Sequence, residues 1–199
     1  MEAMQKPHLP NWLKKLPNKL TYSRIAVIPI LLMIYPWGID FISVFSACLF
    51  GAAALTDFFD GYLARKYHNT TRMGEILDPI ADKLLITAAI VLLANSQIMP
   101  AWMAGLFLCR EVAVSGLRII AAEKNQGLAV TQLAKWKTLF QDAALFVLLA
   151  NINDFHALGM ILAWIALGLS YYSGYLYWRT FWENENKYQP NAHQQDEVP

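Results

Sequence analysis

Four aspartates stand close together in the sequence, in two short segments that adjoin long apolar runs. Asp57 and Asp60 lie in D-F-F-D-G-Y-L-A-R, and Asp78 and Asp82 lie in G-E-I-L-D-P-I-A-D, with eight residues between the two segments. Carboxylates at membrane depth are costly, so they need a partner or a function. Carboxylate oxygens are also the ligands that Mg²⁺ and other hard cations prefer. The four aspartates therefore predict a divalent metal site.

On two α-helices, these segments would direct their acidic side chains toward one space. At about 100° per residue, the first segment places its aspartates on one arc together with Gly61 and Arg65. The second segment places its aspartates on one stripe with Gly74, because residues four apart share a helix face. Two ions held by four carboxylates fit two-metal phosphoryl transfer, and the last carboxylate can act as a general base.

A local structural role is the alternative for each aspartate taken alone. Asp78 before a proline is typical of a helix start, and Asp60 before a glycine is typical of a turn. Asp82 can pair with Lys83. These alternatives stay open one by one, but the cost of carboxylates near lipid favours a function for the four together.

The composition indicates an integral membrane protein with one domain. The 199-residue chain is 56% hydrophobic and 16% charged, against roughly 25% charged residues in soluble domains. Six apolar runs of near-spanning length predict an all-α bundle of six transmembrane helices, near residues 20–37, 41–62, 78–97, 101–121, 136–151 and 156–178. We expect residues 1–19 to form an amphipathic cytoplasmic segment, residues 20–180 the six-helix domain, and residues 181–199 a polar, disordered tail.

The basic residues predict the orientation of this bundle. An even number of spans puts both termini on one side, and all 16 Lys and Arg residues fall on that side. The opposite loops hold only the charged residues Asp40 and Asp154. Excess Lys and Arg marks the cytoplasmic side, so we expect both termini and the acidic segments at the cytoplasmic face of the inner (plasma) membrane. The net charge of +1 gives no indication of a nucleic-acid partner.

The acidic segments also carry a family resemblance. The pattern D-x-x-D-G-x-x-A-R, eight residues, G-x-x-x-D-x-x-x-D is met at Asp57, Asp60, Gly61, Ala64, Arg65, Gly74, Asp78 and Asp82. On these residues the chain resembles the CDP-alcohol phosphatidyltransferase family, over roughly residues 17–180. The resemblance implies an enzyme that transfers a phosphatidyl group from CDP-diacylglycerol to an alcohol and releases CMP. It also implies a homodimer among membrane lipids.

The resemblance further implies a role for each matching residue. Asp57, Asp60 and Asp78 are expected to bind Mg²⁺ or Mn²⁺, and Asp82 both to contact a metal and to act as the base. The CDP-diacylglycerol site is expected at Asn18, Thr21, Gly61, Arg65, Thr71 and Gly74.

The acceptor alcohol is predicted from segments outside the acidic motif. L-P-N-K-L-T-Y-S-R at 16–24, R-E-V-A-V-S-G-L-R at 110–118 and K-W-K-T at 135–138 resemble family members that use sn-glycerol 3-phosphate. An anionic acceptor needs cations, and the expected ones are Arg110, Arg118, Lys135 and Lys137. We expect Glu111 to pair with Arg118 or Lys135. The alternative for these cations, that they are flanking charges reaching toward lipid headgroups, stays open.

Two other functions are compatible with the same residues. The chemistry can be the same with another acceptor: serine, an inositol phosphate, or phosphatidylglycerol, which would give cardiolipin. A divalent-metal transporter is the alternative from another class, because intramembrane carboxylates often mark ion paths. The aspartates lie at one edge of the predicted bundle, however, and no discontinuous repeat helices are evident, which favours the enzyme.

Overall fold

The computed structural model describes residues 11–37, 40–67, 72–124 and 132–188, with side chains over 22–36, 40–56, 77–124 and 132–185. Apart from the short turns at 96–100, 124 and 151–152, these residues are helical, and they include no strand. The elements are α1 (Asn11–Ile34), η1 (Tyr35–Trp37), α2 (Asp40–Tyr67), α3 (Arg72–Asn95), α4 (Ala101–Glu123), α5 (Gln132–Ala150) and α6 (Asn153–Tyr188). The predicted all-α class is confirmed, and each predicted apolar run corresponds to one helix.

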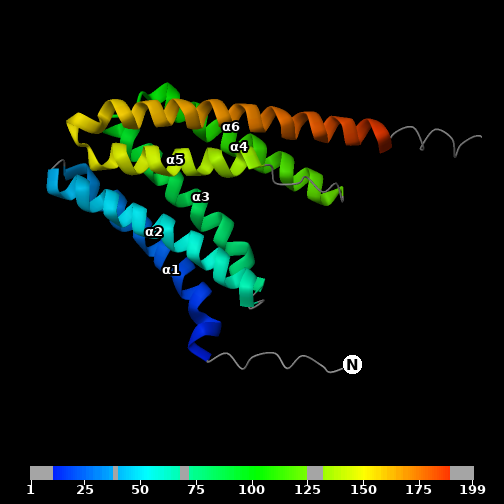
Figure 1. Cartoon of the computed structure of the whole chain (residues 1–199), viewed down its shortest axis with the longest axis horizontal. Coiled ribbons are helices and arrows are strands. Elements are labelled where there is room, and N and C mark those ends of the chain that lie inside the picture. The colour runs from blue at the N-terminus through cyan, green and yellow to red at the C-terminus, as the bar shows by residue number, and fades with distance from the viewer. Residues whose placement is uncertain (1–10, 38–39, 68–71, 125–131, 189–199) are drawn as a thin grey trace, which may run out of the picture.

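Consecutive helices run in alternating directions (Figure 1). The ends at which α1 passes to α2, α3 to α4 and α5 to α6 lie toward the left of the view, and the opposite helix ends lie toward the bottom and the right. Helix α1 packs on α2 and α3, helix α5 packs on α2, α3 and α6, and helix α4 packs on α3 and α6.

The main apolar cluster of the core is shared by all six helices. Its fully buried large side chains include Leu31, Phe50, Leu85, Ile90, Leu93, Met103, Leu145, Leu148 and Leu149. On α3 this cluster begins at Leu85, just C-terminal to Asp82. Asp78 and Asp82 therefore lie beside this cluster rather than within it.

Two glycines allow neighbouring helices to approach α5 closely. A Cβ atom at Gly51 of α2 would lie 2.9 Å from Cδ2 of Phe146, and one at Gly159 of α6 would lie 2.7 Å from Cδ2 of Leu148. Small residues at helix interfaces favour association in membranes, where packing rather than hydrophobic burial drives helix contacts. These glycines therefore fix the spacing of α2, α5 and α6.

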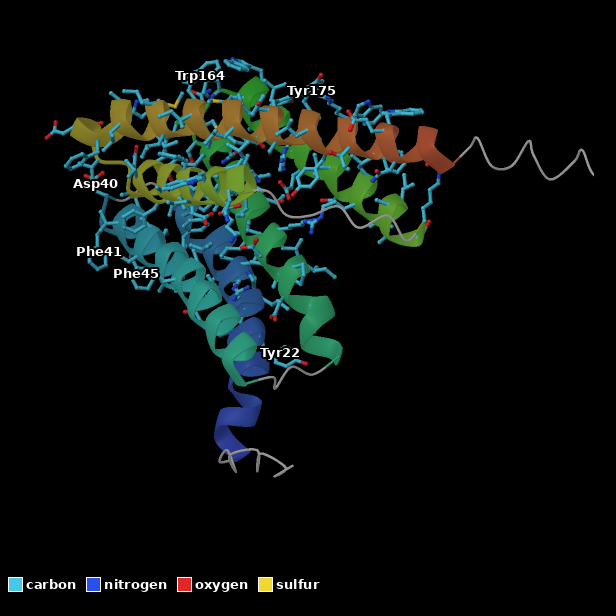
Figure 2. The ribbon with its side chains drawn as sticks, turned by 45° about the vertical axis from the view of Figure 1, so that its right-hand side comes forward. Tyr22, Asp40, Phe41, Phe45, Trp164 and Tyr175 are labelled. Atoms are coloured by element: carbon cyan, nitrogen blue, oxygen red, sulfur yellow. The ribbon has the colours of Figure 1, made fainter. Side chains whose placement is uncertain are left out.

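Large apolar side chains are exposed on the outer surface of the bundle. Phe41 and Phe45 point away from α2 (Figure 2), and Phe41 and Val112 are 77% and 73% exposed. Monomeric soluble proteins rarely expose large contiguous apolar patches, so this surface suits lipid. Within the described side chains, the stretch Asn153–Glu185 is long and apolar enough to cross a membrane, and Tyr22–Ile34 and Asp40–Thr56 are shorter apolar helices.

The C-terminal end of the chain differs from the sequence prediction. Helix α6 continues to Tyr188, because Phe181 is buried in a cluster with Leu117 and Ala121 of α4 and because Lys124 Nζ donates to Glu185 Oε1 at 2.6 Å. The predicted disordered tail, residues 181–199, is therefore helical up to residue 188, and residues 189–199 lie outside the described residues. The predicted N-terminal segment, residues 1–19, is helical from residue 11 as the start of α1.

Candidate active site

Both acidic segments lie inside helices. Helix α2 continues past Asp60 to Tyr67, and α3 begins at Arg72, well before Asp78. The interpretation of Asp60 as part of a turn and of Asp78 as a helix cap is therefore wrong. The predicted helix limits, 62 and 78, fell short because the polar side chains of these segments interrupt the apolar pattern from which the limits were read.

The two acidic segments lie at the same end of the bundle. Helices α2 and α3 contact each other and are antiparallel, and the segments adjoin the end at which α2 passes to α3 (Figure 1). Asp78 and Asp82 are one helical turn apart on α3, and both side chains are partly buried. The side chains of Asp57 and Asp60 lie outside the described set, and within that set no three Asp, Glu, His or Cys residues form a metal-binding group.

The residues expected to bind CDP-diacylglycerol also lie outside the described side chains. Asn18 and Thr21 belong to α1, Gly61 and Arg65 to α2, and Gly74 to α3, while Thr71 falls between α2 and α3. Since α1 contacts both α2 and α3, their backbones form one adjoining group of helices. The roles of these residues stay predictions.

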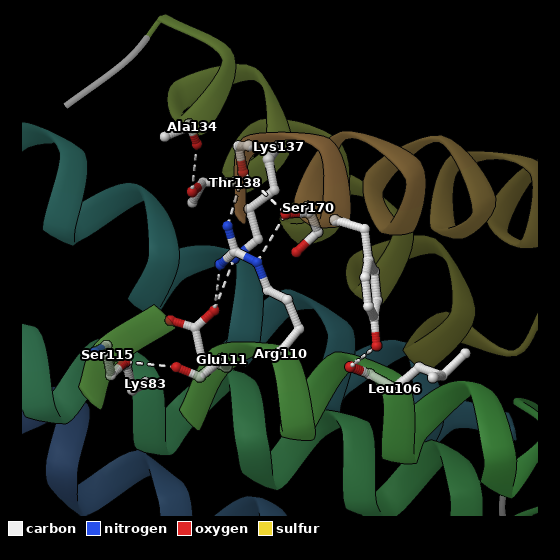
Figure 3. A network of polar contacts seen from close by, with 11 residues as sticks. Lys83, Leu106, Arg110, Glu111, Ser115, Ala134, Lys137, Thr138 and Ser170 are labelled. Atoms are coloured by element: carbon white, nitrogen blue, oxygen red, sulfur yellow. Dashed lines mark hydrogen bonds and ion pairs between the residues drawn. The ribbon is translucent and has the colours of Figure 1, made fainter. Parts of the chain in front are cut away.

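Glu111 brings two of the predicted acceptor-binding cations together (Figure 3). Its Oε2 atom accepts a hydrogen bond from Lys137 Nζ at 2.9 Å and one from Arg110 Nη1 at 3.2 Å. Arg110 and Lys137 are only 8% and 6% exposed. We call Arg110, Glu111 and Lys137 the basic cluster. Its cations are buried, so they do not extend along the surface toward headgroups.

Arg110 also attaches α4 to α6. Its Nε donates to the carbonyl oxygen of Ser170 at 2.9 Å, and its Nη2 donates to Ser173 Oγ at 2.7 Å. Both serines are fully buried. Each of the three guanidinium nitrogens therefore has a defined acceptor, two on α6 and one on Glu111.

A hydrogen-bonded path connects the acidic helix α3 to the basic cluster. Lys83, which follows Asp82, donates from Nζ to Ser115 Oγ at 2.6 Å, and Ser115 Oγ donates to the backbone oxygen of Glu111 at 2.6 Å (Figure 3). Sequence reasoning missed this role of Lys83 and Ser115. The available signals were the position of Lys83 directly after an aspartate and the spacing of four between Glu111 and Ser115.

Arg118 and Lys135 are not part of the basic cluster. Both are exposed, and in the described part of the chain no hydrogen bond or ion pair engages either side chain. The predicted pairing of Glu111 with one of them is wrong. Lys135 and Lys137 are two residues apart and point about 200° apart around α5, so only one of them faces α4. Arg118 is about two turns along α4 from Glu111, beyond the reach of a direct contact.

The arrangement connects the helix that carries Asp78 and Asp82 with the buried cations of the basic cluster. The basic cluster holds two cations and one carboxylate, so it carries an excess of positive charge. A buried charge is costly unless it is paired, and charge-assisted hydrogen bonds to phosphate are among the strong ones. The cluster therefore suits an anionic group brought next to the acidic helix α3.

Comparison with known proteins gives consistent matches over most of the chain. The family model for CDP-alcohol phosphatidyltransferase matches residues 14–172. A Bacillus subtilis protein is 38% identical over 184 residues, which cover 84% of this chain and 95% of the relative. A Rickettsia bellii protein is 40% identical over 171 residues, which cover 83% of this chain and 94% of the relative. Both relatives are named CDP-diacylglycerol–glycerol-3-phosphate 3-phosphatidyltransferase.

A plant relative extends this similarity beyond bacteria. The Arabidopsis thaliana protein CDP-diacylglycerol–glycerol-3-phosphate 3-phosphatidyltransferase 1, chloroplastic/mitochondrial, is 36% identical over 190 residues. The match covers 84% of this chain and 63% of the plant protein. The matched region contains both acidic segments and the basic cluster.

Proposed function

This chain belongs to the CDP-alcohol phosphatidyltransferase family, and we propose that it transfers the phosphatidyl group of CDP-diacylglycerol to sn-glycerol 3-phosphate. The products are phosphatidylglycerophosphate and CMP, in phospholipid biosynthesis. One structural observation supports this most: the path from Lys83 through Ser115 to Glu111 and Lys137. It connects a helix with metal-binding chemistry to buried cations that suit the acceptor's phosphate.

The four aspartates fit divalent metal by their donor chemistry. Carboxylate oxygens are hard ligands, and these residues lie in helix interiors where caps or turns do not account for them. We propose that Asp57, Asp60, Asp78 and Asp82 hold Mg²⁺ or Mn²⁺, as two ions. When bound, the ions would neutralise charge on the pyrophosphate of CDP-diacylglycerol and on the departing phosphate.

The protein's own residues supply the proton transfer and the binding of both substrates. Asp82 accepts the proton of the acceptor's 1-hydroxyl group, and that oxygen forms a bond to the phosphorus attached to diacylglycerol. The bond from this phosphorus to the bridging oxygen breaks, and CMP leaves with the electron pair. Asn18, Thr21, Gly61, Arg65, Thr71 and Gly74 would hold the CDP part.

The basic residues would bind the phosphate of the acceptor. Lys137 and Arg110 offer buried positive charge, and the exposed Arg118 and Lys135 would contribute to the approach of the anion. A neutral or zwitterionic acceptor such as serine would leave the excess charge of the basic cluster unpaired. This favours a phosphorylated alcohol over serine.

The membrane arrangement is part of the proposal. Alternating helices with an exposed apolar surface support six spans in the inner membrane, and the positive-inside rule places both termini and the site on the cytoplasmic side. The acyl chains of CDP-diacylglycerol would then stay among membrane lipids while its pyrophosphate reaches α2 and α3. The family resemblance supports a homodimer.

An acceptor panel tests the proposed function. The purified full-length protein would receive CDP-diacylglycerol, Mg²⁺ and one labelled acceptor at a time: sn-glycerol 3-phosphate, serine, an inositol phosphate or phosphatidylglycerol. We expect CMP release and a labelled lipid with sn-glycerol 3-phosphate. Turnover with one of the other acceptors but not with sn-glycerol 3-phosphate would overturn the substrate assignment. If no acceptor led to CMP release, the proposal that this protein is a phosphatidyltransferase would be refuted, and metal transport would be tested next.

A further inference from the structure

Glu111 is the contact through which the two buried cations of the basic cluster are held. Lys137 Nζ and Arg110 Nη1 both donate to the same atom, Glu111 Oε2, at 2.9 Å and 3.2 Å. Two cationic groups this close repel each other when no anion lies between them. The carboxylate of Glu111 therefore holds Lys137 Nζ and Arg110 Nη1 close together before any substrate binds.

The two cations differ in how many contacts fix their positions. Arg110 uses all three nitrogens, since Nε and Nη2 donate to Ser170 and Ser173 of α6. Lys137 Nζ, within the described residues, donates a single hydrogen bond, to Glu111. A guanidinium has five N–H donors and an ammonium group has three, so each cation keeps two donors for a phosphate. Among the described side chains, however, only the position of Lys137 Nζ depends on the contact with Glu111 alone.

Glu111 is itself fixed in position by α3 and α4. Its backbone oxygen accepts from Ser115 Oγ at 2.6 Å, and Ser115 Oγ accepts from Lys83 Nζ at 2.6 Å. The side chain of Glu111 is 28% exposed, whereas that of Lys137 is 8% exposed. The carboxylate thus stands at the edge of the buried cluster, and the backbone of Glu111 is connected through Ser115 to the helix that carries Asp82.

We propose that Glu111 is a positioning residue for the acceptor's phosphate, and that it acts by holding the ammonium group of Lys137 in place. The proposal rests on the proposed function, because it concerns the phosphate of the same acceptor. Glu111 does not touch the reacting atoms. Its carboxylate directs one donor of Lys137 to itself and leaves the others for the phosphate.

The test compares Glu111→Ala and Glu111→Gln with a matched control, Glu123→Gln, an exposed glutamate at the end of the same helix. Steady-state kinetics with the full-length protein would measure KM for each substrate and kcat. We expect Glu111→Ala to raise KM for sn-glycerol 3-phosphate about tenfold, with KM for CDP-diacylglycerol within about twofold of wild type. Glu111→Gln should give an intermediate KM, because its amide oxygen still accepts from Lys137. The control should match wild type.

A double-mutant cycle separates positioning from a general structural role. If Glu111 acts through Lys137, then Glu111→Ala should raise KM for sn-glycerol 3-phosphate by less than about twofold in the Lys137→Met background. The proposal would be overturned if Glu111→Ala raised KM for sn-glycerol 3-phosphate equally in the wild-type and Lys137→Met backgrounds. It would also be overturned if Glu111→Ala raised KM equally for both substrates. A lower KM for sn-glycerol 3-phosphate in Glu111→Gln would also overturn it, because the carboxylate would then be opposing the phosphate.

The outcomes distinguish this proposal from the proposed function. Wild-type protein that makes no phosphatidylglycerophosphate refutes the function, and the role of Glu111 falls with it. Wild-type protein that is active, together with unchanged kinetics in Glu111→Ala, refutes only the role of Glu111. If Glu111→Ala does not fold, Glu111→Gln and the cycle built on it decide the question, since glutamine keeps the size and the acceptor oxygen.

Discussion

Arg110 is the residue whose replacement should weaken the fold most among the cations of α4. Its guanidinium lies in the interface between α4 and α6 and is 8% exposed, with acceptors on Ser170, Ser173 and Glu111. Arg110→Met keeps an unbranched apolar side chain of similar length but removes the charge and every donor. We expect this variant to unfold at markedly lower denaturant than wild type.

The expected magnitude follows from the contacts that are lost. Interhelical hydrogen bonds in membrane proteins contribute about 0.6 kcal/mol on average and up to about 1.7 kcal/mol, and bonds to charged groups lie toward the upper end. Two such bonds and the ion pair with Glu111 predict a loss of about 3 kcal/mol in the free energy of unfolding. The replacement leaves no isolated buried ion, because Glu111 Oε2 still accepts from Lys137 Nζ at 2.9 Å. The Ser170 carbonyl oxygen also keeps an acceptor contact, since Ser173 Oγ donates to it at 3.0 Å.

The assay is denaturant unfolding of the purified protein in detergent, followed by tryptophan fluorescence. Arg179→Met is the matched control, because Arg179 forms an exposed ion pair with Glu183 at 2.7 Å on α6. Exposed pairs of this kind contribute little, so the control should be indistinguishable from wild type. Equal stability of Arg110→Met and Arg179→Met would refute the role of Arg110 as a connection between α4 and α6.

Three further predictions concern the site and the packing. Asp82→Asn should lower kcat by about 10²–10⁴-fold without loss of folding, as expected for a general base; near-wild-type turnover would refute that role. Gly159→Leu should destabilise the protein by about 1–3 kcal/mol by overpacking against Leu148, whereas Gly168→Leu should be tolerated because nothing lies within 4 Å of its Cβ position; equal melting temperatures would contradict this. Phe181→Ala should lower the unfolding free energy by about 3 kcal/mol, and an unchanged value would show that the end of α6 does not depend on α4.

Sequence patterns predicted the helices well, but they predicted helix ends poorly. Six apolar runs correspond to six helices, because length and hydrophobicity are properties of each segment alone. The extension of α2 to Tyr67 and the start of α3 at Arg72 involve polar residues, which carry no apolar signal. The extension of α6 depends on contacts with α4 at Phe181 and Glu185, and such contacts are not visible in one segment.

The site shows the same division between local and tertiary information. The spacing of Asp78 and Asp82 predicts a shared helix face, which needs only the helix period. The partners of Glu111 depend on how α4 crosses α5, so the sequence could not choose Lys137 over Lys135. Likewise, Ser170 and Ser173 are recognised as partners of Arg110 only when α6 lies against α4.

The central claim is that acids from α2 and α3 hold the same metal ions. Titration of Mn²⁺ into the purified protein, with free ion followed by electron paramagnetic resonance, tests this directly for Asp57→Asn, Asp78→Asn and the control Asp154→Asn, which lies at the other end of the bundle. We predict that either of the first two variants weakens Mn²⁺ binding by at least about tenfold, while the control binds like wild type. Wild-type Mn²⁺ binding in both Asp57→Asn and Asp78→Asn would contradict the claim.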